Sequence, residues 1–87
     1  MTVRDARPHL LDTTGLLCPV PVLLTARAMA TLAEGERLEL VGDDPEILRD
    51  IPVWCEQTGN RLLEMTRVGR KIRCRLEKAS LAPIRAS

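Results

Sequence analysis

The stretch Leu16–Pro21 places a cysteine between a tight turn and a helix, where a thiol can act as a nucleophile. Gly15 allows a sharp turn just before it, and Val22–Ala30 is rich in helix-forming residues. This order predicts Cys18 as the N-cap of the helix. A thiol at that position lies at the positive end of the helix dipole, which favours the thiolate. Cys18 is therefore a candidate nucleophile.

Two prolines follow this cysteine, at the start of the predicted helix. Pro19 and Pro21 fall in the first turn, where the amides that they lack would have no partner within the helix. The amide of Val20 is then the nearest one that can face the sulfur. The alternative is that Cys18 packs as a small buried hydrophobic residue, as most free cysteines do. The placement alone leaves both interpretations open.

The other two cysteines, Cys55 and Cys74, predict neither a disulfide framework nor a zinc site. Three cysteines at wide spacings are an odd set, and His9 is the sole histidine. We therefore expect no metal. Both cysteines fall on apolar faces of predicted elements and are expected in the core.

The composition indicates one small domain with an aliphatic core. The chain has 87 residues, of which 45% are hydrophobic, and Trp54 is the sole aromatic residue. No apolar run is long enough to cross a bilayer, and residues 1–8 lack the apolar segment of a signal peptide. We expect a cytoplasmic protein without membrane contact, made of an arm (1–8), a domain (9–78) and a tail (79–87).

The first half of the chain predicts a strand, a helix and a second strand. A strand covers His9–Thr13, and the helix that follows Cys18 is expected to end at Gly35 in the left-handed conformation. Apolar residues recur on that helix at three- and four-residue steps and should face the core. This set is Val22, Thr25 or Ala26, Met29 and Leu32. Alternation in Glu36–Val41 indicates a strand with Leu38 and Leu40 on one face.

The second half predicts an interrupted helix and a hairpin. Asp44 is the expected N-cap, and Pro52 is expected to break the helix near Asp50, so that Asp50 caps a second segment up to Gly59. A strand then begins at Asn60 or Arg61, turns at 68–70 and returns as Lys71–Glu77.

The element order β-α-β-α-β-β predicts an α/β fold, a two-layer sandwich in which both helices cover one face of a mixed four-stranded sheet. The first two strands should be parallel and the last two should form a hairpin. Lys71, Arg73 and Arg75 would then project from the open face.

Charge is segregated along the chain although the net charge is only +1. Residues 34–56 carry a net charge of −6 and residues 61–78 a net charge of +5. Such a surface can steer a charged partner, or it can consist of ordinary solvated faces.

Several short motifs together resemble the TusA family of SirA-like sulfur carriers. They are Leu11-Asp12, Gly15-Leu16, Cys18-Pro19-Val20-Pro21, Gly35, Asp44-Pro45, Asp50-Ile51-Pro52 and Gly59. The likeness covers about Leu10 to Lys78. Leu17 and Asn60 depart from the family pattern, in which the first position is often polar and the second is often histidine.

The resemblance implies a sulfurtransferase that accepts sulfane sulfur on Cys18 as a persulfide, from a cysteine desulfurase or another persulfide donor, and passes it to an acceptor protein. It implies no cofactor besides that covalent sulfur, and a pathway of tRNA thiolation, sulfur oxidation or molybdenum-cofactor synthesis. The supporting motif residues would be Gly15, Leu16, Pro19, Pro21, Asp44 and Asp50. We expect partners to dock on Leu17, Leu23, Arg27, Arg73 and Arg75.

The alternative is a small regulatory or nucleic-acid-binding module that uses Lys71, Arg73 and Arg75. The scarcity of aromatic residues for base stacking and the near-zero net charge disfavour direct nucleic-acid binding.

Overall fold

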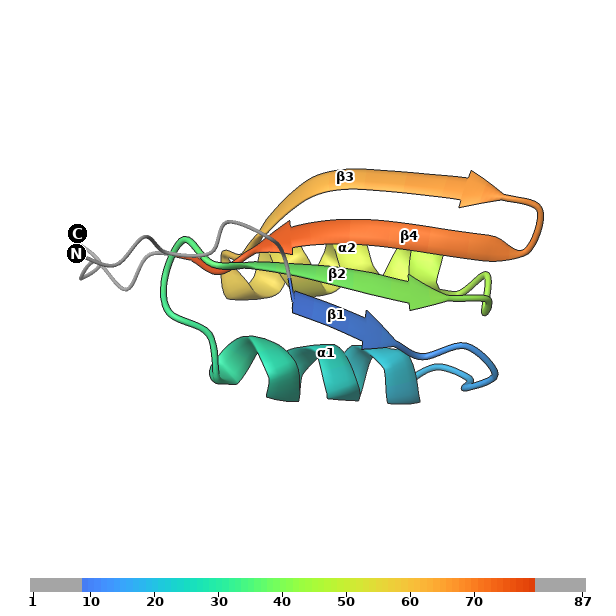
Figure 1. The fold of residues 1–87 in the computed structure, drawn as a ribbon, viewed down its shortest axis with the longest axis horizontal. Coiled ribbons are helices and arrows are strands. Elements are labelled where there is room, and N and C mark those ends of the chain that lie inside the picture. Colours follow the sequence, from blue (N-terminus) through green and yellow to red (C-terminus); the bar gives the residue numbers. More distant parts are fainter. Residues whose placement is uncertain (1–8, 80–87) are drawn as a thin grey trace.

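A computed structural model describes residues 9–79 and contains six elements (Figure 1). They are β1 (His9–Asp12), α1 (Val20–Ala30), β2 (Arg37–Gly42), α2 (Ile47–Thr58), β3 (Arg61–Val68) and β4 (Lys71–Glu77). The predicted order of strands and helices is confirmed. The expected arm at 1–8, and the expected tail from residue 80 onward, lie outside the described residues.

The four strands form one mixed sheet in the order β1-β2-β4-β3. β1 and β2 are parallel, with Leu11 opposite Leu40, whereas β4 is antiparallel to both of its neighbours. Of the two residues that join β3 to β4, only Gly69 has a positive φ, of 61°. This is the pattern of a type II′ hairpin turn, whose first central position favours glycine. The predicted parallel pair and hairpin are both confirmed.

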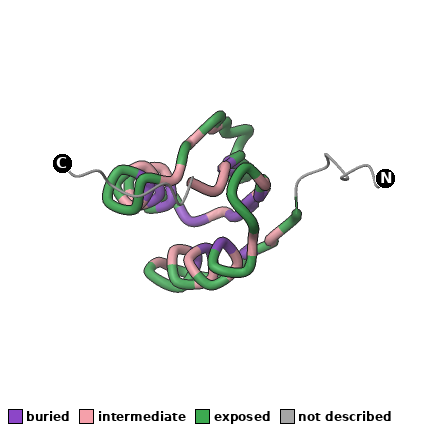
Figure 2. The backbone as a smooth tube through the Cα atoms, turned by 90° about the vertical axis from the view of Figure 1, so that its left-hand side faces the viewer, coloured by how far each residue is buried: buried purple, intermediate pink, exposed green. Residues whose placement is uncertain are grey.

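Both helices pack on the same face of this sheet. Met29 from α1 and Ile51 from α2 join the inward side chains of β2 and β4 in one core. The full set of buried core residues is Met29, Leu38, Leu40, Ile47, Ile51, Cys55, Ile72, Cys74 and Leu76. Figure 2 shows the buried stretches of the chain where helices and strands face one another. The alternate positions Arg73 and Arg75 lie on the opposite, exposed face, as the alternation predicted.

Helix α1 is shorter at both ends than the sequence predicts. It begins at Val20, and its last turn tightens so that the amides of Thr31 and Leu32 donate to carbonyls three residues earlier. Gly35 has φ of 86° but lies beyond the helix, where its amide donates to the Lys78 carbonyl. The prediction that Gly35 ends the helix is therefore wrong. Thr25, rather than Ala26, is the buried residue of the α1 core face.

Helix α2 runs unbroken through Pro52, contrary to the prediction. Its buried residues Ile47, Ile51 and Cys55 follow one another at four-residue steps. Burying two isoleucines and a cysteine contributes on the order of 1.5–3 kcal/mol for each large side chain, which offsets the roughly 3 kcal/mol that an internal proline costs. Asp50 is thus an interior residue of α2 and caps no second segment. The predicted end at Gly59 is confirmed by its left-handed φ of 84°.

Within residues 9–79, neither helix has the length and apolar character needed to cross a membrane.

Candidate functional site

Cys18 lies in the loop that joins β1 to α1, at the end of the sheet where β1 and β2 both stop (Figure 1). The thiol is half-buried, while Leu16 and Leu17 on its N-terminal side are exposed. The Cys18–Pro19 peptide bond is cis. Helix α1 begins two residues later, with Pro21 at its second position.

Cys18 is not the N-cap of α1, which corrects the sequence prediction. The cap position falls on Pro19, whose carbonyl accepts from the Leu23 amide at 3.0 Å. The Val20 amide, expected to face the sulfur, instead donates to the Leu17 carbonyl at 2.9 Å. The N-terminus of the helix therefore stabilises a Cys18 thiolate less than the dipole argument assumed.

Two consecutive aspartates of the β2–α2 loop hold the Cys18 loop by its backbone. The Gly15 amide donates to Asp43 Oδ1 at 3.0 Å, and the Cys18 amide donates to Asp44 Oδ2 at 2.7 Å. The other oxygen of Asp44 accepts from the Glu46 amide at 3.0 Å. Hydrogen bonds from the Cys18 and Glu46 amides hold the pKa of Asp44 below its ordinary value of 3.8. Asp44 is only 8% exposed and acts as a bridge between the two loops.

Thr13 fixes the beginning of the Cys18 loop. Its amide and its hydroxyl both donate to the Val41 carbonyl, at 2.7 and 2.8 Å, and the residue is fully buried. Sequence reasoning missed both Thr13 and Asp43. The sequence did contain a signal for these contacts. Thr13 directly follows β1, and Asp43 and Asp44 directly follow β2. Because parallel strands end at the same edge of a sheet, these residues are expected to lie close together.

The surroundings of the thiol are acidic, and they act against the predicted thiolate. Burial, a hydrogen bond to Asp50, and the negative charges of Asp44, Asp50 and Glu46 together raise the pKa of Cys18 to about 12. A helix N-terminus carries about half a positive charge. Several carboxylates nearby outweigh that half charge, so the isolated protein keeps Cys18 as a thiol.

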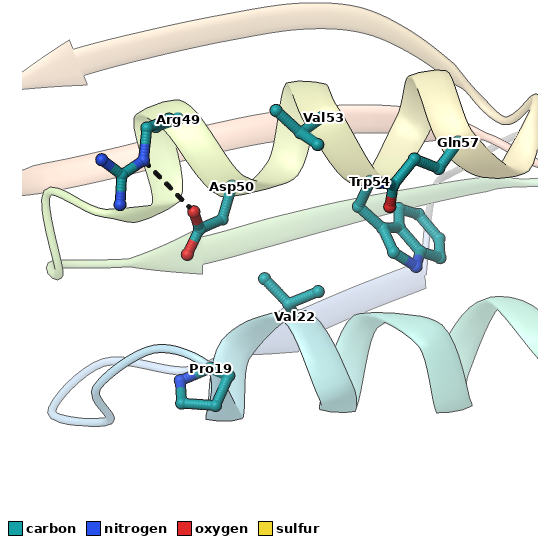
Figure 3. A pocket seen from close by; sticks show the side chains of 7 residues that line it. All are labelled: Pro19, Val22, Arg49, Asp50, Val53, Trp54 and Gln57. Carbon is teal, nitrogen blue, oxygen red and sulfur yellow. Dashed lines mark ion pairs between the residues drawn. The ribbon is translucent and has the colours of Figure 1, made fainter.

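A groove of about 410 Å³ runs between α1 and α2, and Pro19, the residue that follows Cys18, forms part of its lining (Figure 3). Its lining residues are Pro19, Val22, Arg49, Asp50, Val53, Trp54 and Gln57. Val22 points into it from α1, and the Asp50 carboxylate and the Trp54 indole reach into it from α2. Arg49 Nε lies 3.5 Å from Asp50 Oδ1 at one side of the groove.

The predicted docking residues divide into two groups. Leu17, Leu23 and Arg27 are exposed on the Cys18 loop and α1, and the first two are 71% and 59% exposed. Arg73 and Arg75 lie on the open face of the sheet, away from the helices, and are not brought to Cys18. That face is not simply basic.

Glutamates pair with the arginines of the open face. Arg73 Nε lies 2.8 Å from Glu39 Oε2, and Arg75 approaches Glu64 at 3.8 Å. These pairs weaken the alternative of a nucleic-acid interface on Lys71, Arg73 and Arg75, because much of its positive charge is compensated.

Cys55 and Cys74 are buried in the core as predicted, and burial raises their pKa values to about 11 and about 12. Among residues 9–79, no three His, Cys, Asp or Glu side chains are grouped so as to hold a metal ion. The chemistry that this arrangement supports is that of one accessible thiol, anchored by its backbone and bordered by carboxylates and an apolar groove.

Comparisons with known proteins identify the family and support the fold. The family model described as "Sulfurtransferase TusA" matches residues 9–78. A protein of Aquifex aeolicus (strain VF5) named "Putative sulfur carrier protein" is 40% identical over 72 residues, which are 83% of this chain. The chain spans only 36% of the length of that relative.

A solved structure has the same fold. The crystal structure of the SirA-like protein from Desulfitobacterium hafniense superposes with a TM-score of 0.71, covers 82% of this chain and 97% of its own, and is 22% identical. It confirms the two-layer arrangement of two helices on a mixed four-stranded sheet. With a family match over most of its length, the chain belongs to the TusA family of sulfurtransferases.

Proposed function

We propose that this protein is a sulfur carrier that accepts sulfane sulfur on Cys18 as a persulfide and relays it to an acceptor protein. The observation that carries the proposal is that Cys18 alone among the three cysteines is open to solvent, on a loop whose backbone is anchored by Asp43 and Asp44. Family membership supplies the sulfur chemistry.

The transfer is redox-neutral. The sulfur of Cys18 forms a bond to the outer sulfur of a donor persulfide, and the S–S bond of the donor breaks. The donor cysteine leaves with the electron pair and takes up a proton, so that one thiol and one persulfide exchange places. A cysteine desulfurase or another protein persulfide would serve as the donor, and the sulfur is carried covalently without a bound cofactor.

The small site supports a carrier rather than a hydrolase. A cysteine hydrolase needs a base beside the nucleophile, and His9, the sole histidine, lies at the start of β1. The groups that approach Cys18 are carboxylates, which hold its proton rather than remove it. The proposed sulfurtransferase therefore depends on partner proteins for the catalytic groups. The pathway, whether tRNA thiolation, sulfur oxidation or molybdenum-cofactor synthesis, depends on those partners.

Mass spectrometry tests the proposal directly. The protein is incubated with a cysteine desulfurase and cysteine, and its intact mass is expected to increase by one sulfur atom that a reductant removes. Cys18→Ser should abolish this gain while keeping the fold, because the half-buried site accepts an oxygen in place of sulfur and the backbone bond to Asp44 remains. Cys55→Ala is the matched control and should gain sulfur normally. Sulfur uptake by Cys18→Ser to the wild-type extent would refute the proposal.

A further inference from the structure

The groove between α1 and α2 combines apolar walls with the Asp50 carboxylate and, at one side, the Arg49 side chain. Val22 and Val53 face it from the two helices, and Trp54 forms part of its wall with its indole ring (Figure 3). The Asp50 side chain is 32% exposed there. A ligand that suits this lining has an apolar stem and a positively charged head, which is the construction of a lysine or arginine side chain.

Asp50 also acts on the nucleophile. It lines the same groove as Pro19, the residue that follows Cys18, and its negative charge is among the causes that raise the pKa of the Cys18 thiol. Arg49 is the cation already present, but it is exposed, lies 3.5 Å from Asp50, and also pairs with Glu46. Because such an exposed ion pair contributes little free energy, a cation from a partner can replace Arg49 at Asp50.

We infer that the sulfur-donating protein inserts a lysine or arginine side chain into this groove, pairs it with Asp50, and thereby releases Cys18 for reaction. This inference rests on the proposed function and names the partner's contribution to it. The inserted cation neutralises the Asp50 carboxylate, so part of the negative charge near Cys18 is removed and the thiolate becomes easier to form. The thiol proton is then free to leave.

Activation by the partner has a chemical consequence for the choice of donor. In the transfer, Cys18 Sγ bonds to the outer sulfur of the donor persulfide, and the departing donor cysteine receives the released proton. A donor with a positive charge near its sulfur both approaches the acidic site and activates it. Small anionic sulfur compounds meet Asp44, Glu46 and Asp50 and react slowly.

A series of small disulfides measures this preference. Cystamine carries two ammonium groups, bis(2-hydroxyethyl) disulfide is neutral, and 3,3′-dithiodipropionate carries two carboxylates. Each forms a mixed disulfide with Cys18, followed by intact mass and peptide mapping. The ratio of the cystamine rate to the dithiodipropionate rate is compared with the same ratio for N-acetylcysteine amide, a neutral free thiol.

We expect the ratio on wild-type protein to exceed that of the free thiol by about tenfold or more. Asp50→Asn should reduce it by about fivefold, the effect of one unit charge at about 8 Å in water that acts with opposite sign on the two charged disulfides. Glu56→Gln is the matched control, because it removes the same charge from an exposed position of the same helix outside the groove, and it should leave the ratio unchanged. A wild-type ratio equal to that of the free thiol, or an unchanged ratio in Asp50→Asn, would overturn the inference.

A second measurement needs no variant. The n-butylguanidinium ion imitates an arginine side chain, and at constant ionic strength it should accelerate the reaction of wild-type Cys18 with the neutral disulfide several-fold and saturably. Tetramethylammonium, which lacks the hydrogen-bonding head, serves as the control. Equal effects of the two cations would contradict the inference. Sulfur uptake from a desulfurase is a separate assay, so normal uptake without charge preference would leave the carrier function intact and remove only this inference.

Discussion

Cys18 is exposed enough to react, yet its neighbours oppose its ionisation. Burial comes first among the causes of its raised pKa, followed by the hydrogen bond to Asp50 and the charges of Asp44, Asp50 and Glu46. A thiol with such a pKa is almost entirely protonated at neutral pH. The residue therefore combines accessibility with low intrinsic reactivity, which in the proposed carrier would limit nonspecific thiol chemistry.

The pH dependence of alkylation tests this protection. A pKa of about 12 means that the thiolate forms only at high pH, so the rate with iodoacetamide should rise about tenfold for each pH unit from 7 to 10. An ordinary cysteine, with a pKa of about 8.5, levels off above pH 9. Asp50→Asn should move the curve to lower pH. Peptide mapping assigns the label to Cys18, and levelling of its rate below pH 9 would contradict the expectation.

Asp44 provides a second test at this scale, because its two oxygens accept two backbone amides. In Asp44→Asn the side chain keeps one acceptor oxygen, so the amide of either Cys18 or Glu46 loses its partner. We expect the free energy of unfolding at pH 7 to fall by about 1–3 kcal/mol, measured with urea. Faster hydrogen exchange at these two amides should accompany the loss.

Because the pKa of Asp44 is lowered in the folded protein, Asp44→Asn should also change how stability depends on pH. A carboxyl group with a lower pKa in the folded state stabilises the protein above its unfolded pKa and loses that contribution as the pH falls. The wild-type protein should therefore lose stability as the pH drops through and below 3.8, and Asp44→Asn should lose less. Parallel loss of stability with pH in both proteins would show that Asp44 does not contribute.

At the scale of elements, the strands were the most predictable part of the fold. Alternating residues in Lys71–Glu77 place Ile72 and Cys74 on the buried face, and two residues separate this strand from β3. These are local sequence patterns, and the sheet in the structure agrees with them. The helix ends were less predictable, because Pro52 stays inside α2 through the burial of Ile51 and Cys55, which depends on tertiary packing.

The site shows the same division. Cys18 and its prolines are contiguous, so the sequence identified them directly, and Asp44 and Asp50 followed from the family resemblance. The bonds from Gly15 to Asp43 and from Cys18 to Asp44 join residues 28 and 26 positions apart. No local pattern encodes such contacts. The raised pKa of the thiol was missed for the same reason, since α2 supplies Asp50 and the turn before it supplies Glu46.

Gly42 at the end of β2 tests the packing behind the Cys18 loop. A Cβ atom there would lie 2.5 Å from Ile47 Cδ1 and 2.6 Å from Thr13 Oγ1, and both residues are fully buried. We expect Gly42→Ala to lower the free energy of unfolding by about 1–3 kcal/mol, as overpacking does. Adding Ile47→Val removes the closer clashing atom. The double variant should therefore be less destabilised than the sum of the two single changes, and strict additivity would contradict this account.

For the molecule as a whole, folding redistributes the segregated charge of the sequence. The acidic stretch contains β2 and the basic stretch contains β4, and these strands are neighbours. Pairs such as Glu39 with Arg73 therefore compensate each other on the open face. The acids that follow β2, namely Asp43, Asp44, Glu46 and Asp50, remain at the Cys18 end. In the folded protein, the remaining uneven distribution of charge is therefore an excess of acidic residues near Cys18 and not a basic face of the sheet.

Reversing the charges of the open face separates these two regions experimentally. Arg73→Glu with Arg75→Glu places like charges beside Glu39 and Glu64, and we expect the free energy of unfolding to fall by about 1–2 kcal/mol. Alkylation of Cys18 and sulfur uptake should stay within twofold of wild type. Arg73→Gln with Arg75→Gln is a milder control. A tenfold loss of sulfur uptake in the folded double variant would show that partners dock on the open face after all.

The register of the sheet also fixes where the chain can be extended. His9 lies opposite Leu38, which pairs with Leu76, so both described ends of the chain leave from the end of the sheet away from Gly42 and the Cys18 loop. A fluorophore, an affinity tag or a linker to another domain attached at these ends would therefore not crowd the thiol. The fold is suited to immobilisation on a surface, with the Cys18 loop directed into solution.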